Sequence, residues 1–189
     1  MGKNVIFVIS GVSGAGKGTV INGILKSGKF NLARGINVTT RPREARDKDE
    51  PHFQYVTSLE FKKMIKAGEL LEYDYHHQNY YGTNRLIIEK LLKKHNILME
   101  ADVNGALEIK KKMKYVVLIY ITVDLTTLRK RVQKRGNETE KEIDLRMKRA
   151  SLENEKGKNY NYNIENPEGH PEVAINKVLG IIKKELQKK

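Results

Sequence analysis

Three short apolar runs stand out along the chain, and helical patterns surround them. The runs are Val5–Ser10, Ile97–Ala101 and Tyr115–Val123. Because each run is apolar at consecutive positions, it predicts a strand buried on both faces. Apolar residues at helical spacing occupy five further segments, which are Val20–Lys26, Leu86–Lys94, Leu125–Lys134, Thr139–Glu155 and Val173–Leu186. Strands that alternate with helices predict an α/β fold with a parallel, doubly wound sheet.

Two segments break this alternation. Residues 36–84 are rich in Tyr, Thr and charge, which predicts an inserted, mostly β subdomain; within it, Thr57 and Glu60 form a capping box for a short helix. Residues 128–150 are predicted to form a pair of Arg-rich helices. We therefore expect five segments: core 1–35, insertion 36–88, core 89–127, the helical pair 128–150 and core 151–189.

Composition narrows the classes of function. The chain of 189 residues is 39% hydrophobic and has no Cys, which excludes disulfides and cysteine-ligated metal sites. Its 36 Lys and Arg against 23 Asp and Glu give a net charge of +13, which favours polyanionic partners without choosing among them. The apolar runs are too short to span a bilayer, and the first does not read as a signal peptide. We expect a cytoplasmic protein.

The sharpest motif follows the first predicted strand and opens a helix, the context of a phosphate-binding loop. Its glycines let backbone N–H groups turn toward phosphate oxygens, and its lysine reaches the β and γ phosphates. Here Gly18 separates Lys17 from Thr19, and the resulting sequence Gly-Lys-Gly-Thr is typical of small-nucleotide kinases. The predicted ATP-binding residues of this loop are Gly11, Ser13, Gly14, Ala15, Gly16, Lys17, Gly18 and Thr19.

Over nearly its whole length the chain resembles guanylate kinases. The resemblance rests on further motifs in the family's order: Thr39–Arg41, Glu72 followed by Asn79–Thr83, Glu100–Gly105 and Arg131–Gly136. It implies a P-loop core, a GMP-binding insertion at residues 36–88 and a small helical lid at residues 128–150. The implied reaction is ATP + GMP to ADP + GDP, with Mg²⁺ carried by ATP near Thr19 and Glu100 and no dedicated protein metal site. The implied partners are ATP and GMP, with no dedicated nucleic acid and no membrane, in a monomer or homodimer.

The resemblance also implies roles for single residues. A carboxylate can accept both the N1–H and the exocyclic amine of guanine, a role that falls to Glu72, while Thr83 would meet O6 and Asp102 would support the amine edge. Arg41 and Tyr81 match positions that hold the monophosphate. The full predicted set for GMP is Thr39, Arg41, Arg43, Phe53, Glu72, Tyr81, Thr83 and Asp102.

The lid supplies further arginines. Arg131 and Arg135 share one helical face, as do Arg146 and Arg149, and such groups can neutralise charge on transferring phosphates. We predict that Arg131 and Arg135 bind ATP. The predicted catalytic residues are Lys17, Arg41, Arg135 and Arg146. We expect Lys110–Lys112 to be solvated surface, and His76 and His77 to be solvated or to have packing roles.

The sequence departs from the family pattern in three places. The compressed segment Arg41–Arg43 leaves Arg43 or Arg46 as a second phosphate-binding arginine, and we favour Arg43. Phe53 stands where the family has a tyrosine whose hydroxyl touches the monophosphate. Tyr120–Asp124 replaces a usual Pro-Pro pair.

Three alternatives remain at this point. A related ribose bisphosphate kinase would lack a preference for guanine, against which Glu72 and Thr83 argue. A non-catalytic interaction domain of this family would lack the phosphate loop, which is intact here. A nucleic-acid binder would use the positive charge, but the motifs account for the arginine clusters without it.

Overall fold

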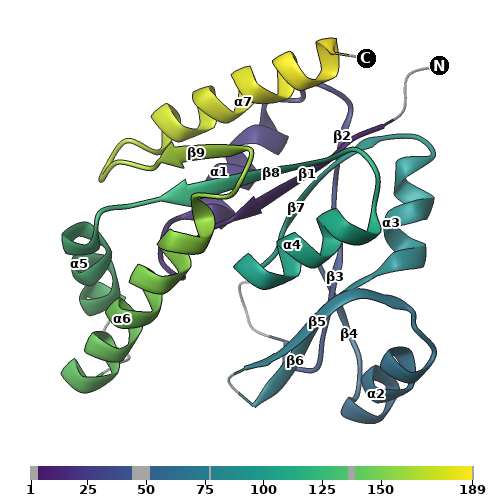
Figure 1. Cartoon of the computed structure of the whole chain (residues 1–189), viewed down its shortest axis with the longest axis horizontal. Coiled ribbons are helices and arrows are strands. Elements are labelled where there is room, and N and C mark those ends of the chain that lie inside the picture. Colours follow the sequence, from purple (N-terminus) through teal and green to yellow (C-terminus); the bar gives the residue numbers. More distant parts are fainter. Residues whose placement is uncertain (1–3, 44–51, 77, 136–138, 189) are drawn as a thin grey trace.

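The computed structural model describes residues 4–43, 52–76, 78–135 and 139–188 (Figure 1). In this part of the chain, the larger sheet has five strands in the order β2-β7-β1-β8-β9, and every neighbouring pair is parallel. The strands are β1 (Ile6–Ser10), β2 (Leu32–Arg34), β7 (Asn96–Glu100), β8 (Val116–Thr122) and β9 (Tyr162–Glu165).

Helices cover both faces of this sheet, as the alternating side chains of β1 show. Phe7 and Ile9 pack in one apolar cluster with α1 (Lys17–Lys26) and α7 (Pro171–Gln187). Ile6 and Val8 pack in a second cluster on the other face. The helices that contribute to that second cluster are α3 (Arg85–Leu92) and α4 (Val103–Lys112). A strand between two helical layers needs apolar residues at consecutive positions, which is the pattern of the first run.

A second, smaller sheet has the order β4-β3-β6-β5. Its strands are β3 (Asn37–Thr39), β4 (Phe53–Tyr55), β5 (Leu70–His76) and β6 (Asn79–Asn84). One face is covered by α2 (Ser58–Lys66), whose Phe61 packs with Val38 and Leu70. The predicted capping box is confirmed, since Thr57 and Glu60 bond reciprocally at the start of α2.

Two further helices, α5 (Leu125–Arg135) and α6 (Glu140–Gly157), follow β8 and lie on the opposite side of the molecule from the small sheet (Figure 1). Leu128 of α5 and Ile143 of α6 pack into the same cluster as α1 and α7. Within the described ranges, no helix is long and apolar enough to cross a membrane.

The predicted fold class is confirmed, and the predicted strands and helices lie within three residues of the observed ends. Three elements were not predicted: β2, β9 and α4. The two strands are only three and four residues long and carry little apolar pattern. Helix α4 does carry a signal, because Val103, Ala106 and Ile109 recur at every third position and are buried. The five-segment division remains a prediction, and its limits at 88, 128 and 150 fall inside α3, α5 and α6.

A buried asparagine anchors one end of the large sheet. Asn96, 7% exposed at the start of β7, accepts a hydrogen bond at Oδ1 from the backbone N–H of Val5 (3.0 Å). Its Nδ2 donates to the carbonyl of Phe30 (3.0 Å), in a loop where Phe30 and Asn31 have positive φ. One side chain therefore joins β1, β7 and the loop before β2.

We expect Asn96→Leu to lower the free energy of unfolding by about 2–4 kcal/mol, because a buried N–H loses its acceptor and a partly buried carbonyl loses its donor. Urea denaturation measures the change. Asn176→Leu, on the exposed face of α7, is the matched control and should change stability by less than about 0.5 kcal/mol. Equal effects in the two variants would contradict the anchoring role.

Candidate active site

The loop between β1 and α1 is shaped by glycines that no other residue type could replace easily. Gly14 and Gly16 have φ of 99° and 87°, in the left-handed region, and Gly16 caps α1. A Cβ atom on Gly16 would lie 2.4 Å from Nδ2 of Asn166. The first turn of α1 carries no acidic residue. This helix start therefore presents backbone N–H groups and partial positive charge, as an anion site requires.

Lys17 is held at the mouth of this loop. Its Nζ donates to the carbonyl oxygens of Gly11 (2.8 Å) and Val12 (3.2 Å) and lies 3.6 Å from Oε1 of Glu100. The side chain of Lys17 is only 13% exposed. Since β1 and β7 are neighbours, the sheet itself places the ammonium between the loop and the carboxylate that ends β7.

A residue that the sequence analysis missed supports the loop from the other side. Asn166 directly follows β9, is 3% exposed, and donates from Nδ2 to the carbonyl of Ala15 (2.7 Å). Its backbone N–H donates to Thr122 (2.9 Å), which extends the pairing of β8 with β9. The signal that could have found it is its place after a strand, but a four-residue strand with one buried residue was not recognisable.

Two lid arginines reach the loop. Arg131 of α5 donates to the carbonyl of Asn166 (3.2 Å) and pairs with Glu168, and Nη1 of Arg146 in α6 lies 3.5 Å from Oγ of Ser13. The side chain of Arg135 lies outside the described residues. Between loop and lid is a recess of about 360 Å³, here called the loop recess. It is lined by Gly14, Gly16, Thr19, Arg131, Lys134, Asn166, Pro167, Glu168, Gly169 and Pro171.

The small sheet gathers a second group of predicted residues on one face. In its register, Glu72 pairs with Thr83 and Asp74 pairs with Tyr81. Tyr81 also pairs with Thr39. Because side chains alternate along a strand, directly paired residues share a face. That face, here called the polar face, lies opposite α2 and carries Asn37, Thr39, Phe53, Tyr55, Glu72, Asp74, His76, Tyr81 and Thr83.

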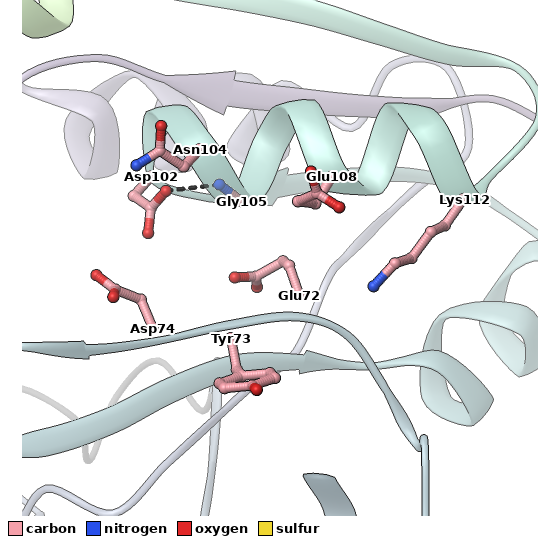
Figure 2. A pocket seen from close by; sticks show the side chains of 8 residues that line it. All are labelled: Glu72, Tyr73, Asp74, Asp102, Asn104, Gly105, Glu108 and Lys112. Atoms are coloured by element: carbon pink, nitrogen blue, oxygen red, sulfur yellow. Dashed lines mark hydrogen bonds between the residues drawn. The ribbon is translucent and has the colours of Figure 1, made fainter.

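Glu72 lies between the polar face and α4 (Figure 2). The Thr83 hydroxyl donates to its Oε1 (2.6 Å). On the other side, a Cβ on Gly105 would lie 2.6 Å from its Oε2, so α4 approaches this closely only because residue 105 is glycine. Asp102 caps α4 by accepting from the N–H of Gly105 (2.7 Å). These groups enclose a recess of about 220 Å³, the acidic recess, lined by Glu72, Tyr73, Asp74, Asp102, Asn104, Gly105, Glu108 and Lys112.

The surroundings of Glu72 disfavour its charged form. Burial raises the pKa of Glu72 to about 7, and the neighbouring carboxylates of Asp102 and Asp74 add to the rise. The hydrogen bond from Thr83 and the charge of Lys112 oppose it. A strongly perturbed carboxylate in a recess is typical of functional sites.

The other end of the polar face is rich in cations and rings. The guanidinium of Arg41 lies 5.0 Å from the ring centre of Phe53 and 5.6 Å from that of Tyr55, and Arg43 lies 4.9 Å from the Tyr55 ring. The rings of Phe53 and Tyr81 are 6.4 Å apart, edge to face. Phe53 therefore faces the same side as Tyr81 and not the cluster under α2. Arg46 lies outside the described residues.

A chain of contacts joins the polar face to the phosphate loop. Asn37 donates from Nδ2 to the backbone carbonyl of Glu100 (3.0 Å), and its Oδ1 lies 3.4 Å from the Thr83 hydroxyl. The carboxylate of Glu100 is the group that pairs with Lys17. The two groups of predicted residues are therefore joined through β7.

Two expectations about charged residues are tested by the structure. Lys110–Lys112 were expected to be solvated surface, and all three are exposed. Lys112 in addition donates to the carbonyl of Leu71 and lines the acidic recess, because the end of α4 packs beside β5. His76 has a packing role, since its ring stacks on Tyr81 at 4.2 Å. His77 lies outside the described residues.

Comparison with known proteins identifies the same family as the sequence motifs. The family model described as guanylate kinase matches residues 3–185. The chain belongs to the guanylate kinase family. It is 36% identical over 185 residues to the guanylate kinase of Oceanobacillus iheyensis, covering 97% of this chain and 88% of the relative. It is 34% identical over 188 residues to that of Thermotoga maritima, covering 98% and 89%.

The crystal structure of guanylate kinase from Anaplasma phagocytophilum matches with a TM-score of 0.77 at 26% identity, over 98% of this chain and 87% of that one. Membership identifies the chain as an ATP:GMP phosphotransferase, a nucleoside monophosphate kinase that uses ATP with a divalent metal. A ribose bisphosphate kinase and a non-catalytic interaction domain are not favoured. The roles of single residues in this guanylate kinase remain predictions.

The raised pKa of Glu72 predicts a pH-dependent stability. The folded state binds this proton more tightly than the unfolded chain, so stability is lost as pH rises from about 4.5 to about 7. Gln does not ionise, so this loss of stability is absent from Glu72→Gln. The free energy of unfolding of Glu72→Gln minus that of wild type should therefore be about 1–3 kcal/mol larger at pH 8 than at pH 5. Urea denaturation at both pH values measures this.

Glu165→Gln, at an exposed position on β9, is the control for this prediction. Its free energy of unfolding relative to wild type should change by less than about 0.5 kcal/mol between pH 5 and pH 8. A stability difference between Glu72→Gln and wild type that is independent of pH would show that Glu72 ionises normally.

Proposed function

We propose that ATP binds along the phosphate loop and the loop recess while GMP lies on the polar face, with its base in the acidic recess. The shared face carries this proposal, since residues from three separate sequence motifs, at 39–41, 72 and 81–83, meet there only through strand register. The contacts through Asn37 and Glu100 support a transfer path from one nucleotide to the other.

On the ATP side, the loop N–H groups and Lys17 hold the phosphates. Arg146 and Arg135 add charge from the lid, and Arg131, held by Glu168, lines the loop recess beside the phosphate loop. The Thr19 hydroxyl and the Glu100 carboxylate are oxygen ligands of the kind Mg²⁺ prefers, and Mg²⁺ usually keeps waters and substrate phosphates beside a few protein ligands. When bound with ATP, Mg²⁺ neutralises charge on the β and γ phosphates.

On the GMP side, Glu72 accepts two hydrogen bonds from guanine, which replace the one it accepts from Thr83. The Thr83 hydroxyl then donates to O6, and Asp102 supports the amine edge. Adenine has a lone pair at N1, which a carboxylate repels. A polar site left unpaired by the wrong base can discriminate by about 10⁴-fold. Arg41, Arg43 and Tyr81 hold the monophosphate, and Thr39 supports Arg41 by accepting a hydrogen bond at Oγ1 from the backbone N–H of Arg41 (3.2 Å).

The chemistry needs no general base, because the attacking phosphate oxygen of GMP is already anionic near neutral pH. The protein contributes position, positive charge and exclusion of water. We propose that the lid and the insertion close together over the nucleotides and so suppress hydrolysis of ATP. We also propose a cytoplasmic monomer or homodimer that takes nucleotides as partners and no dedicated nucleic acid or membrane.

An ADP-release assay with GMP, dGMP, AMP, CMP and UMP tests this function. We expect GMP to be the preferred ribonucleotide by a large factor. Lys17→Met should abolish transfer with the fold intact, because the lysine charge is required where charge builds up on the transferring phosphate. Glu72→Gln should raise the KM for GMP much more than that for ATP.

A folded Lys17→Met variant with near-wild-type turnover would overturn the loop assignment. Unchanged GMP affinity in Glu72→Gln would place base recognition elsewhere. Lys26→Met, at the exposed far end of α1, is the control and should leave both parameters unchanged.

The arginine that supports the GMP phosphate can be identified separately. Loss of a charge-assisted contact predicts that Arg43→Ala raises the KM for GMP about tenfold, while Arg46→Ala has a much smaller effect. Phe53→Tyr should lower that KM, because it restores a hydroxyl on the polar face. Steady-state kinetics at saturating ATP measure all three variants, and an equal or reversed ranking of the two arginines would contradict the assignment.

A further inference from the structure

Asp74 is a carboxylate of the polar face that the predicted GMP contacts do not use. It lines the acidic recess and, in Figure 2, its carboxylate points toward α4 from the side of β5. It follows Glu72 by two residues on the same face, which is about 7 Å along a strand. In the register of the sheet it lies directly opposite Tyr81.

This position adjoins both ends of a bound GMP, because Asp74 lines the recess that contains Glu72 and lies level with Tyr81. Glu72 and Thr83 mark the base end, and Tyr81 with Arg41 marks the phosphate end. In any nucleotide the ribose separates base from phosphate. The ribose would therefore lie over the part of the face that Asp74 occupies.

Two neighbouring polar groups at the start of α4 have partners within the protein. Asp102 accepts a hydrogen bond from the N–H of Gly105, and Oδ1 of Asn104 accepts one from Lys156. Asp74 has one contact on its own strand, 3.2 Å from Nδ1 of His76. Its side chain remains 56% exposed, so its oxygens are accessible to a ligand in the recess.

We propose that the Asp74 carboxylate accepts hydrogen bonds from the ribose hydroxyls of GMP and makes the enzyme prefer GMP to dGMP. The proposal rests on the placement of GMP proposed above. A carboxylate that binds ribose hydroxyls is a known device in nucleotide sites. Binding of the ribose would have a second effect here. Its hydroxyl donors would reduce the repulsion among the carboxylates of Asp74, Glu72 and Asp102, which is present when the recess holds no ligand.

The test compares kcat/KM for GMP and dGMP in wild type, Asp74→Ala and Asp74→Asn. Both nucleotides carry the same base and phosphate, so any effect of Asp74 on Glu72 or Tyr81 cancels in their ratio. We expect wild type to favour GMP by about tenfold or more, the order of one charge-assisted hydrogen bond. Asp74→Ala should bring the ratio close to one by slowing GMP more than dGMP, which keeps only the 3′-hydroxyl, and Asp74→Asn, which keeps an acceptor oxygen, should be intermediate.

Two control variants separate a direct contact from indirect ones. Tyr75→Phe alters the adjacent residue on the other face and should keep the wild-type ratio. His76→Phe keeps a ring on Tyr81 but removes the contact with Asp74, and it should also keep the ratio. A ratio lowered as much by His76→Phe as by Asp74→Ala would overturn a direct contact of Asp74 with the ribose.

The outcomes also distinguish this proposal from the proposed function. An active wild type whose ratio is near one, or an Asp74→Ala variant with the wild-type ratio, overturns the role of Asp74 and leaves the kinase intact. A wild type that phosphorylates neither GMP nor dGMP overturns both.

Discussion

The ion pair between Lys17 and Glu100 is the interaction on which the rest of the site depends. Glu100 ends β7, beside the strand that leads into the phosphate loop, and its carboxylate lies 3.6 Å from the Lys17 ammonium. Its backbone carbonyl accepts a hydrogen bond from Asn37 of the small sheet. The same residue therefore positions the phosphate-binding charge and ties the polar face to the core. Because adjacent parallel strands end at one edge of a sheet, topology alone brings these groups together.

Carboxylates in this protein divide into structural and functional ones according to their surroundings. At the exposed start of α2, hydrogen bonds from the backbone and side chain of Thr57 hold the pKa of Glu60 below its usual range. At the acidic recess, burial raises the pKa of Glu72 to about 7, and two nearby carboxylates reinforce the rise. The first arrangement stabilises a helix. The second leaves the Glu72 carboxyl with only one hydrogen-bond donor among the described residues, Thr83, and a ligand that offers two donors would stabilise its charged form.

The features of this protein that could be predicted from the sequence are those encoded by short, local motifs. The phosphate loop was recognisable because the spacing of its glycines and lysine determines its geometry. The capping box of α2 was recognisable because the side chains of Thr57 and Glu60 mark the start of a helix. Asn166, Lys112 and Asp74 had no such signal. Asn166 becomes part of the site only because β9 adds to the sheet beside β8, and Lys112 only because α4 packs beside β5. Asp74 needs the register of β5 and β6, which no short motif encodes.

Two glycines show how far the site depends on such long-range contacts. Gly16 makes room for Asn166, and Gly105 makes room for Glu72, since a Cβ atom at either position would fall 2.4 Å or 2.6 Å from the respective side chain. Each contact joins residues far apart in the chain, and each lies at one of the two proposed nucleotide positions. A Cβ on Gly18, by contrast, would meet nothing within 4 Å. A side chain at 16 or 105 would therefore displace Asn166 or Glu72, whereas one at 18 would displace none of the described residues, so the departure from the usual loop pattern at 18 leaves both contacts unchanged.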